Sequence, residues 1–391
     1  MPVINRLAEM HDQITAWRRD LHENPEIDFD VHRTAGLVAQ RLRAFGCDEV
    51  VEGLGRTGVV GVIRGRATGS GRVVALRADM DALPIAEQTG LPWASRTPGR
   101  MHACGHDGHT AMLLGAAQHL AETRNFDGVA VVVFQPAEEG GGGGREMVRD
   151  GLMERFGVQQ VFGMHNMPSL PAGAFALRPG PIMAAADHFD IEIAGVGGHA
   201  ARPHGCVDPV VAAAHVITAL QSVVARSVDP VESAVVTVAS VHSDNDTYNV
   251  IPGVVRLRGT ARTLSAAVQD LVEARVAAVV ETAARAFGAT ARIDYVRDYP
   301  VTVNAPEAAA FAAAVAADVA GAAAVDAATP PLMGAEDFSF MLNARPGAMI
   351  FIGNGDTAGV HHPAYDFNDA IIPAGCSYWV RLIEKAMPAA A

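Results

Sequence analysis

The chain reads Val131-Val132-Val133-Phe134-Gln135-Pro136-Ala137-Glu138-Glu139, and glycines occupy positions 140 to 144. A β-branched run therefore ends in two adjacent carboxylates. Open α/β sheets bind their ligands outside the carboxyl ends of their strands, where one acid can bind a metal ion while its neighbour moves a proton. Two acids after a strand are equally typical of a helix cap or a solvated loop, so the interpretation depends on whether the pattern recurs.

The pattern recurs in four further segments. Residues 72–81 form an apolar run that ends in two aspartates, and residues 161–165 form another that ends in a histidine. Residues 101–109 carry three histidines, a cysteine and an aspartate just before a helical pattern. The apolar run 348–352 leads through a glycine-rich loop to the histidine pair 361–362. Core packing does not account for this density of ligand-type side chains, so we expect these segments to serve one site.

Composition restricts the class of protein. A chain of 391 residues is longer than a single core supports, so two domains are expected. The formal net charge of −13 argues against a nucleic-acid partner, which needs a basic patch. Four scattered cysteines and no apolar leader favour a cytoplasmic protein without a disulfide framework. Residues 209–225 are the most apolar segment but contain His215 and Gln221 and fall short of the roughly 20 residues of a transmembrane helix, so no membrane partner is expected.

Two kinds of pattern divide the chain. Helices and strands alternate over residues 1–180, which predicts an α/β fold with a mainly parallel sheet covered by helices. Residues 181–295 follow the order β-α-β-β-α-β, which predicts an inserted α+β domain of the ferredoxin-like kind. From residue 296 the patterns resemble those of the first part again. We therefore predict a discontinuous metal-binding domain, residues 1–180 plus 296–391, interrupted by a second domain.

The residue types indicate a metal-dependent hydrolase. Thiol, imidazole and carboxylate donors together suit zinc, manganese, cobalt or nickel better than calcium or magnesium, which prefer oxygen. Five candidate ligands exceed what one tetrahedral site uses while a position stays open for water, so we infer two divalent metal ions, with the Cys104 thiolate as a natural bridge. Either Glu138 or Glu139 can take a proton from the attacking water. Amide hydrolysis is the reaction that most needs these parts, because its amine leaving group must be protonated.

Five blocks then stand in order between residues 18 and 165: Arg18-Arg19-Asp20-Leu21-His22-Glu23-Asn24-Pro25-Glu26, Arg77-Ala78-Asp79-Met80-Asp81-Ala82-Leu83-Pro84, Cys104-Gly105-His106-Asp107-Gly108-His109, Glu138-Glu139-Gly140 and Gly163-Met164-His165. They resemble the M20 metallopeptidase family, and within it the branch of N-acyl amino acid amidohydrolases that includes hippurate hydrolases. The resemblance runs from about residue 15 to 385, nearly the whole chain. The resemblance implies hydrolysis of the amide bond of hippurate-like or N-acetyl amino acids to a carboxylic acid and a free amino acid.

The resemblance also implies roles for single residues of the metal-binding domain. By position, the metal ligands match Cys104, His106, Glu139, His165 and His361. His361 matches rather than His362 because the family pattern is a histidine, one variable residue and a proline, as in His361-His362-Pro363. Glu138 matches the general base, and Asp81 matches an acid that orients a neighbour at the metal site. The two expected ions are zinc or manganese, with cobalt or nickel as alternatives.

The inserted domain, residues 181–295, is implied to be a lid that forms a homodimer, with a tetramer as a further option. His199 matches a lid histidine that stabilises the oxyanion, usually from the partner subunit. Asn249 and Arg262 resemble lid positions that hold the carboxylate of a small-molecule substrate.

Other interpretations remain open. His22, His102 and His109 are ligand types, yet a local hydrogen bond explains each more simply. Cys104 and His106 could form a thiol nucleophile and its base, although residues two apart rarely face each other. An aminoacyl or dipeptide carboxypeptidase of the same family is an alternative, and a non-catalytic metal-stabilised binding protein is another.

Overall fold

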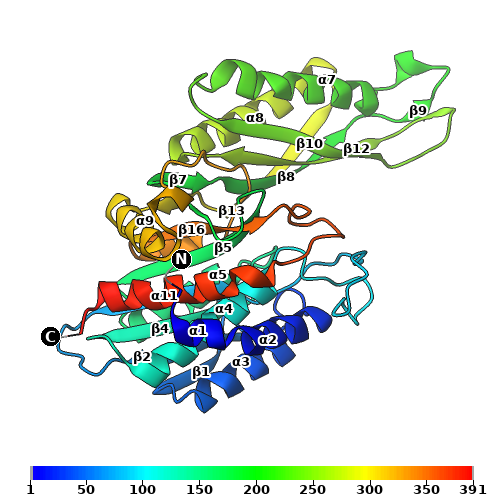
Figure 1. Cartoon of the computed structure of the whole chain (residues 1–391). Helices are drawn as coiled ribbons and strands as arrows, with labels where there is room; N and C mark the ends of the chain where they lie inside the picture. Colours follow the sequence, from blue (N-terminus) through cyan, green and yellow to red (C-terminus); the bar gives the residue numbers. More distant parts are fainter. Residues whose placement is uncertain (1–2, 390–391) are drawn as a thin grey trace. The chain divides into compact units, whose positions relative to one another are not determined.

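The chain divides into two compact units in the computed structural model, which describes residues 3–389 (Figure 1). The first unit runs to Ile182 and continues as Val303–Pro330 and from Asp337 onward. The inserted unit comprises Met183–Thr302 and Pro331–Glu336. The chain re-enters the first unit at Val303 and not at residue 296, because strand β13 continues to Tyr299 in the sheet of the inserted unit.

The first unit is built on an eight-stranded sheet with the order β1-β2-β4-β3-β5-β16-β6-β15. The strands are β1 (Glu49–Leu54), β2 (Gly58–Arg64), β3 (Val73–Asp79), β4 (Val129–Gln135), β5 (Gln160–Pro168), β6 (Phe175–Ala176), β15 (Val325–Asp326) and β16 (Gly347–Gly355). Its central strands β4, β3, β5 and β16 are parallel, whereas β1 and β2 pair antiparallel at one edge. The predicted mainly parallel sheet is confirmed.

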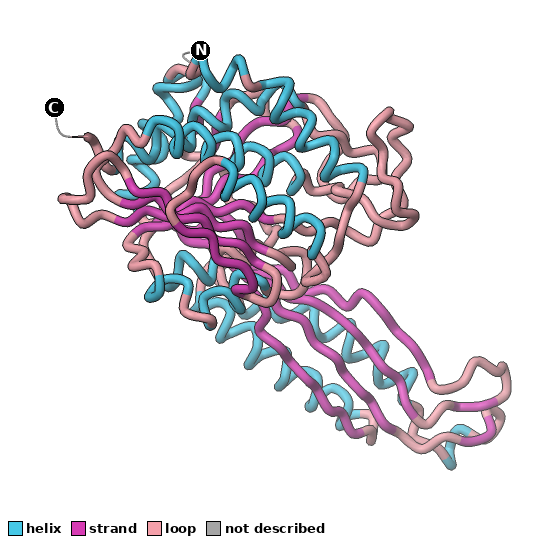
Figure 2. The backbone as a smooth tube through the Cα atoms, turned by 90° about the horizontal axis from the view of Figure 1, so that it is seen from below, coloured by secondary structure: helices cyan, strands magenta, loops and turns pink. Residues whose placement is uncertain are grey.

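Helices cover this sheet, as the tube view shows (Figure 2). They are α1 (Asn5–Glu9), α2 (His11–Glu23), α3 (His32–Ala44), α4 (His106–Thr123), α5 (Gly143–Arg149), α6 (Leu152–Arg155), α9 (Pro306–Ala320), α10 (Ser339–Ala344) and α11 (Ile372–Ala386). Residues 131–134 of β4 are fully buried, and strands buried on both faces read as continuous apolar runs. The opening segment of the sequence is therefore the centre of the core.

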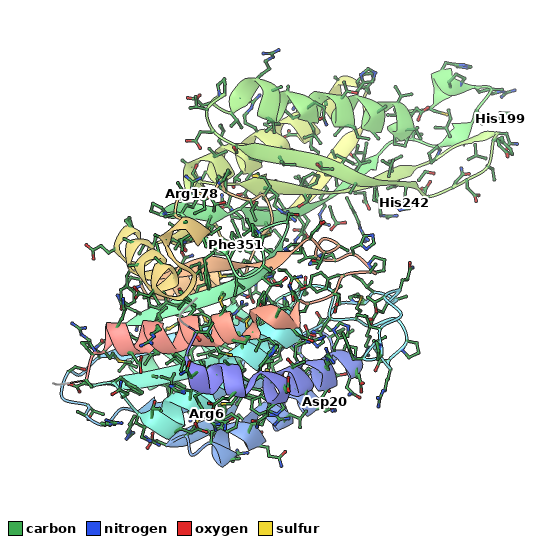
Figure 3. The ribbon with its side chains drawn as sticks, in the orientation of Figure 1. Arg6, Asp20, Arg178, His199, His242 and Phe351 are labelled. Atoms are coloured by element: carbon green, nitrogen blue, oxygen red, sulfur yellow. The ribbon has the colours of Figure 1, made fainter. Side chains whose placement is uncertain are left out.

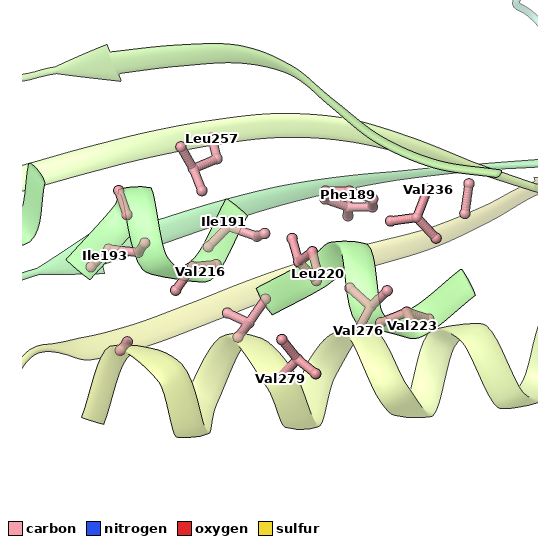
Figure 4. Packing of buried hydrophobic residues seen from close by; sticks show 14 of the residues in the cluster. Phe189, Ile191, Ile193, Val216, Leu220, Val223, Val236, Leu257, Val276 and Val279 are labelled. Atoms are coloured by element: carbon pink, nitrogen blue, oxygen red, sulfur yellow. The ribbon is translucent and has the colours of Figure 1, made fainter. Parts of the chain in front are cut away.

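The inserted unit has a four-stranded antiparallel sheet with the order β10-β12-β8-β13. Its elements are β8 (Ala185–Ala194), α7 (Pro209–Ser222), β10 (Ala234–Ser243), β12 (Val254–Thr263), α8 (Ala266–Ala286) and β13 (Thr290–Tyr299). This is the predicted β-α-β-β-α-β order. Ile191, Leu257, Leu220 and Val276 pack between the sheet and the helices (Figure 4).

Short strands complete the structure. β9 (Gly198–His199) pairs with β11 (Val250–Ile251) beyond the end of the four-stranded sheet. β7 (Gly180–Met183) and β14 (Thr302–Asn304) lie where the chain crosses between the units.

Helix α7 and the π-helical turn after it span Pro209–Ser227, which is long and apolar enough to cross a membrane by length and composition alone. The sequence estimate of this segment as too short was wrong, because the helical turns continue to Ser227. One such helix is weak evidence for a membrane span. Here Ala212, Val216 and Leu220 pack into the core of the inserted unit.

Candidate metal centre

The candidate ligands of the first unit lie at the carboxyl ends of its parallel strands. Strand β3 is flanked by β4 on one side and β5 on the other, although β4 and β5 follow it one after the other in the chain. After β3, the chain therefore adds one strand on one side of β3 and the next strand on its other side, so the order of the strands in the sheet reverses there. Ligand sites of open α/β sheets form at such a switch point, and Asp81, Glu139 and His165 come from these three strands or directly follow them.

Asp81 fixes the turn that carries the paired glutamates. Its carboxylate is buried and accepts the backbone N–H of Glu138 at 3.0 Å and that of Glu139 at 3.1 Å. Its backbone carbonyl lies 2.8 Å from Nδ1 of His106 and orients that ring. A ligand imidazole is commonly oriented by a carbonyl or carboxylate behind it, so Asp81 holds three of the expected site residues at once.

The glycine run is a tight turn in this structure. A Cβ atom on Gly143 would lie 1.7 Å from the carbonyl oxygen of Pro136, so no other residue fits there. Ala137 has a φ of +53°, and the Gly144 N–H donates to the buried carboxylate of Asp337 at 2.7 Å. The glycines therefore bring α5 close behind the glutamates.

Gly105 presents Cys104 and His106 on either side of a left-handed turn. Its φ is +89°, and a Cβ atom there would lie 2.3 Å from the side chain of Asn166. Cys104 stands in the loop and His106 is the first residue of α4. The Asn166 amide donates to the Cys104 carbonyl at 2.6 Å and accepts from the Tyr365 hydroxyl at 2.7 Å, which fixes the loop.

The five predicted metal ligands come together as two overlapping groups. Cys104, His106 and His165 offer ligand atoms within 4.8 Å of one another, and so do Cys104, Glu139 and His361. The Cys104 thiol belongs to both groups. Within them, Sγ of Cys104 lies 3.3 Å from Nε2 of His165, and Nε2 of His361 lies 3.3 Å from Oε1 of Glu139. This arrangement fits two ions that share a thiolate.

Two further observations fit bound cations. Nε2 of His106 is buried and has no hydrogen-bond partner among residues 3–389, although buried polar atoms are normally paired. The carboxylate of Glu138, which is buried beside the centre, forms a third group with His106 and Glu139 within the same 4.8 Å limit. Glu138 thus lies directly beside the candidate ligands His106 and Glu139.

The electrostatics favour a metal centre over a cysteine nucleophile. Burial raises the pKa of the Cys104 thiol well above its usual range and lowers that of His165 well below. A catalytic thiolate–imidazolium pair needs the opposite shifts. Burial opposes a charge on His106, but the carboxylates of Asp79 and Asp81 raise its pKa to about 10. A cluster this rich in buried carboxylates is compensated by cations.

The sequence did not predict a buried network of hydrogen bonds and ion pairs behind the candidate ligands. His109 Nδ1 lies 2.7 Å from Oδ1 of Asp79, and its Nε2 accepts the backbone N–H of Asn166 at 2.9 Å. Arg77 donates to Asp79 at 2.8 Å and to Asp337 at 3.0 Å. Asn166 follows His165, so the network holds the strand that carries a ligand. Asp79 is the last residue of β3 and the first of the two acids in a quoted motif, so its place at the end of a buried strand was the available signal.

The two other histidines that were set aside are also buried. His22 Nδ1 lies 2.8 Å from Oδ2 of Asp107, whose charge raises the His22 pKa to about 9 against the effect of burial. Burial lowers the pKa of His102 to about 3, and its ring has no hydrogen-bond partner among residues 3–389.

The three predicted lid residues belong to the inserted unit and do not gather in one place. His199, in β9, is exposed and lies on the same side of the inserted unit as His242, which is near the end of β10 (Figure 3). Asn249 lies beside it, since its carbonyl accepts the Ala200 N–H at 3.0 Å. Arg262 is near the far end of β12, eight residues after Val254, which is about 26 Å of strand.

Comparison with known proteins then places the chain in a family. Residues 75–385 match the model described as peptidase family M20/M25/M40. The chain belongs to this family.

Full-length relatives of the M20 chain include a hippurate hydrolase of Campylobacter jejuni, 40% identical over 98% of this chain and 99% of the relative. Thermostable carboxypeptidase 2 of Saccharolobus solfataricus is 40% identical over 89% of this chain and 88% of the relative. A solved structure from Bacillus subtilis, described as a dinuclear metal-binding peptidase of the M20 family, has a TM-score of 0.84 and is 33% identical, covering 97% of this chain and 99% of that one.

Proposed function

We propose that this M20 hydrolase cleaves the amide bond of N-acyl amino acids and releases a carboxylic acid and a free amino acid. The observation that carries the proposal is the pair of ligand groups that share Cys104 beside the buried Glu138. The hippurate hydrolase relative, similar over its whole length, supports this substrate class.

Two divalent ions would be held by Cys104, His106, Glu139, His165 and His361. When bound, they supply Lewis acidity and lower the pKa of a coordinated water. We propose zinc or manganese, because the donor set mixes a thiol with imidazoles and a carboxylate; cobalt and nickel suit the same donors.

Glu138 is proposed as the proton carrier. Its carboxylate lies within 4.8 Å of the ligand atoms of His106 and Glu139, so it reaches a water held between them. It would take the proton of that attacking water and donate it to the nitrogen of the departing amino acid. The Asp81 carboxylate accepts the backbone N–H of Glu138 and would thereby position the Glu138 carboxylate.

We also propose a homodimer that completes the site. His199 and Arg262 of one chain are separated by more than about 25 Å of β-sheet, so a single small substrate cannot touch both in one subunit. If both act in catalysis, one of them comes from the partner subunit. The edge strand β10 and the exposed Val210 and Val211 of α7 offer a surface for such an association.

The substrate proposal is tested by reconstituting the full chain with zinc or manganese and measuring hydrolysis of hippurate, N-acetyl amino acids and dipeptides side by side. Release of glycine from hippurate is the expected result. Faster cleavage of dipeptides would favour the carboxypeptidase alternative, which the Saccharolobus relative supports. No release from any substrate by metal-loaded protein would contradict catalysis and favour a metal-stabilised binding protein.

The dimer proposal is tested by complementation. A His199→Ala chain and a Glu138→Gln chain are each expected to be inactive, and their mixture to recover up to about a quarter of wild-type activity if one site of the heterodimer is intact. Failure to recover activity in a verified heterodimer would contradict a shared site.

A further inference from the structure

The outer face of β12 carries a row of polar side chains. Successive residues of a strand point to opposite faces, and Val255, Leu257 and Ala261 face the core of the inserted unit. Arg256, Arg258, Thr260 and Arg262 therefore share the other face, which α7 and α8 do not cover.

Among residues 3–389, Arg262 is the only arginine of this row without a salt bridge, although the charges of Asp187 and Asp298 act on it from beyond ion-pair distance. Arg256 pairs with Glu192 at 3.0 Å, and Arg258 pairs with Asp190 at 2.8 Å. Strand register places Arg262 opposite Ala186 on β8 and Val235 on β10. Within the part of the chain that the structure describes, Arg262 forms no ion pair. The half-buried guanidinium therefore has a charge available for an anionic ligand.

Arg262 is held through one nitrogen. Nη1 donates to the carbonyl of Ala261 at 3.0 Å, to that of Asp187 at 3.5 Å and, over a short contact, to Oγ1 of Thr260. Every hydrogen bond that the Arg262 side chain donates to residues 3–389 uses Nη1. The edge formed by Nε and Nη2 remains for a ligand, and two parallel N–H groups match a carboxylate.

Thr260 supplies the only side-chain oxygen within residues 3–389 that accepts a hydrogen bond from Arg262. Its hydroxyl donates to the carbonyl of Asp187 at 2.7 Å, so its lone pairs are left to accept from Arg262. The Asp187 side chain is anchored from the core by the Gln269 amide and the Tyr295 hydroxyl, each at 2.8 Å. A chain of hydrogen bonds therefore connects the core residues Gln269 and Tyr295, through Asp187 and Thr260, to the guanidinium of Arg262.

We propose that Thr260 is a positioning residue that aims Arg262 at the α-carboxylate of the acyl amino acid, and this inference rests on the proposed function. Arg262 makes the contact with substrate, and Thr260 acts through it. The consequence is a preference for substrates whose amino acid has a free carboxylate over the same molecules with a carboxamide.

The test compares hippurate with hippuramide, which lacks the carboxylate, in the metal-loaded dimer. Thr260→Val keeps the β-branched shape and removes the hydroxyl, so the strand is retained. It should raise KM for hippurate about tenfold, the value of one hydrogen bond to a charged group, with kcat nearly unchanged. KM for hippuramide should not change, and Thr260→Ser should restore the wild-type KM for hippurate.

Thr290→Val is the matched control, because Thr290 is an exposed strand threonine on β13, at the edge of the same sheet opposite β10. It should leave both KM values unchanged. Equal changes for hippurate and hippuramide in Thr260→Val, or an equal effect of Thr290→Val, would overturn the proposal.

A crystal structure of Thr260→Val gives a readout that does not depend on catalysis. We expect the guanidinium of Arg262 to leave its wild-type position, and an unchanged guanidinium would refute the role of Thr260. If the wild type hydrolyses neither compound, the proposed function fails, and this structure still decides the role of Thr260.

Discussion

Replacing Asp81 with asparagine should weaken metal binding without removing any ligand. Each carboxylate oxygen of Asp81 accepts one backbone N–H, from Glu138 and from Glu139, at 3.0 and 3.1 Å. Asparagine keeps one acceptor and turns an NH2 group toward the other N–H. One hydrogen bond to a charged group, about 1.5–3 kcal/mol, is lost and a buried donor is left unpaired. The peptide that carries both glutamates should therefore shift.

The affinity for metal should fall about 10–100-fold, as is usual when a residue behind a ligand is changed, and kcat should fall with it. Calorimetric titration of the metal-free protein with zinc or manganese measures the first effect, and hippurate hydrolysis measures the second. Asp20→Asn is the control, since Asp20 is a carboxylate on α2 that pairs with Arg33 at the surface. Wild-type metal affinity and turnover in Asp81→Asn would refute the idea that Asp81 positions the glutamates.

Three further predictions concern the same unit. Glu138→Gln should keep the metal content while kcat falls at least about 100-fold, the usual contribution of a general base; full metal content measured by plasma emission with normal turnover would exclude that role. Chelation should lower both the activity and the melting temperature, because the ligand Glu139 and the buried carboxylates of Asp81 and Glu138 beside it lose a counter-charge; readdition of metal should restore both in the wild type but not in Cys104→Ala. The His22 pKa of about 9 lies above its unfolded value of about 6.5, so its contribution to stability is full below pH 6.5 and is lost as the pH rises through 9. The difference in unfolding free energy between wild type and His22→Phe should therefore shrink by up to roughly 3 kcal/mol over this range, whereas a constant difference in urea titrations would contradict the ion pair.

Much of the candidate centre could be predicted because its signals are local. A buried strand reads as an apolar run, and acids or histidines at its carboxyl end are visible in the same few residues. Cys104 and His106 stand two positions apart at the start of a helix, so their type and spacing suffice. The strands of the central sheet were found for the same reason.

The network behind the ligands could not be predicted in this way. His109 is joined to Asp79 and Asn166, which lie 30 and 57 positions away along the chain. A histidine that forms a structural hydrogen bond and a histidine that binds a metal look the same in a sequence. Only the atoms around the ring distinguish them. The end of the inserted unit was misplaced because β13 belongs to a sheet whose partner strand lies a hundred residues earlier.

By itself, the sequence determined the central strands β3, β4, β5 and β16, the kinds of donor atom and the type of chemistry, because apolar runs and ligand type are properties of short segments. Tertiary structure alone decided which donors share a position around Cys104, and which arginine of β12 has no acid opposite it. It also decided that Arg262 lies near one end of the four-stranded sheet while His199 lies in the separate β9–β11 pair beyond the other end. These are consequences of strand register and strand order, which depend on pairing between segments distant in the chain.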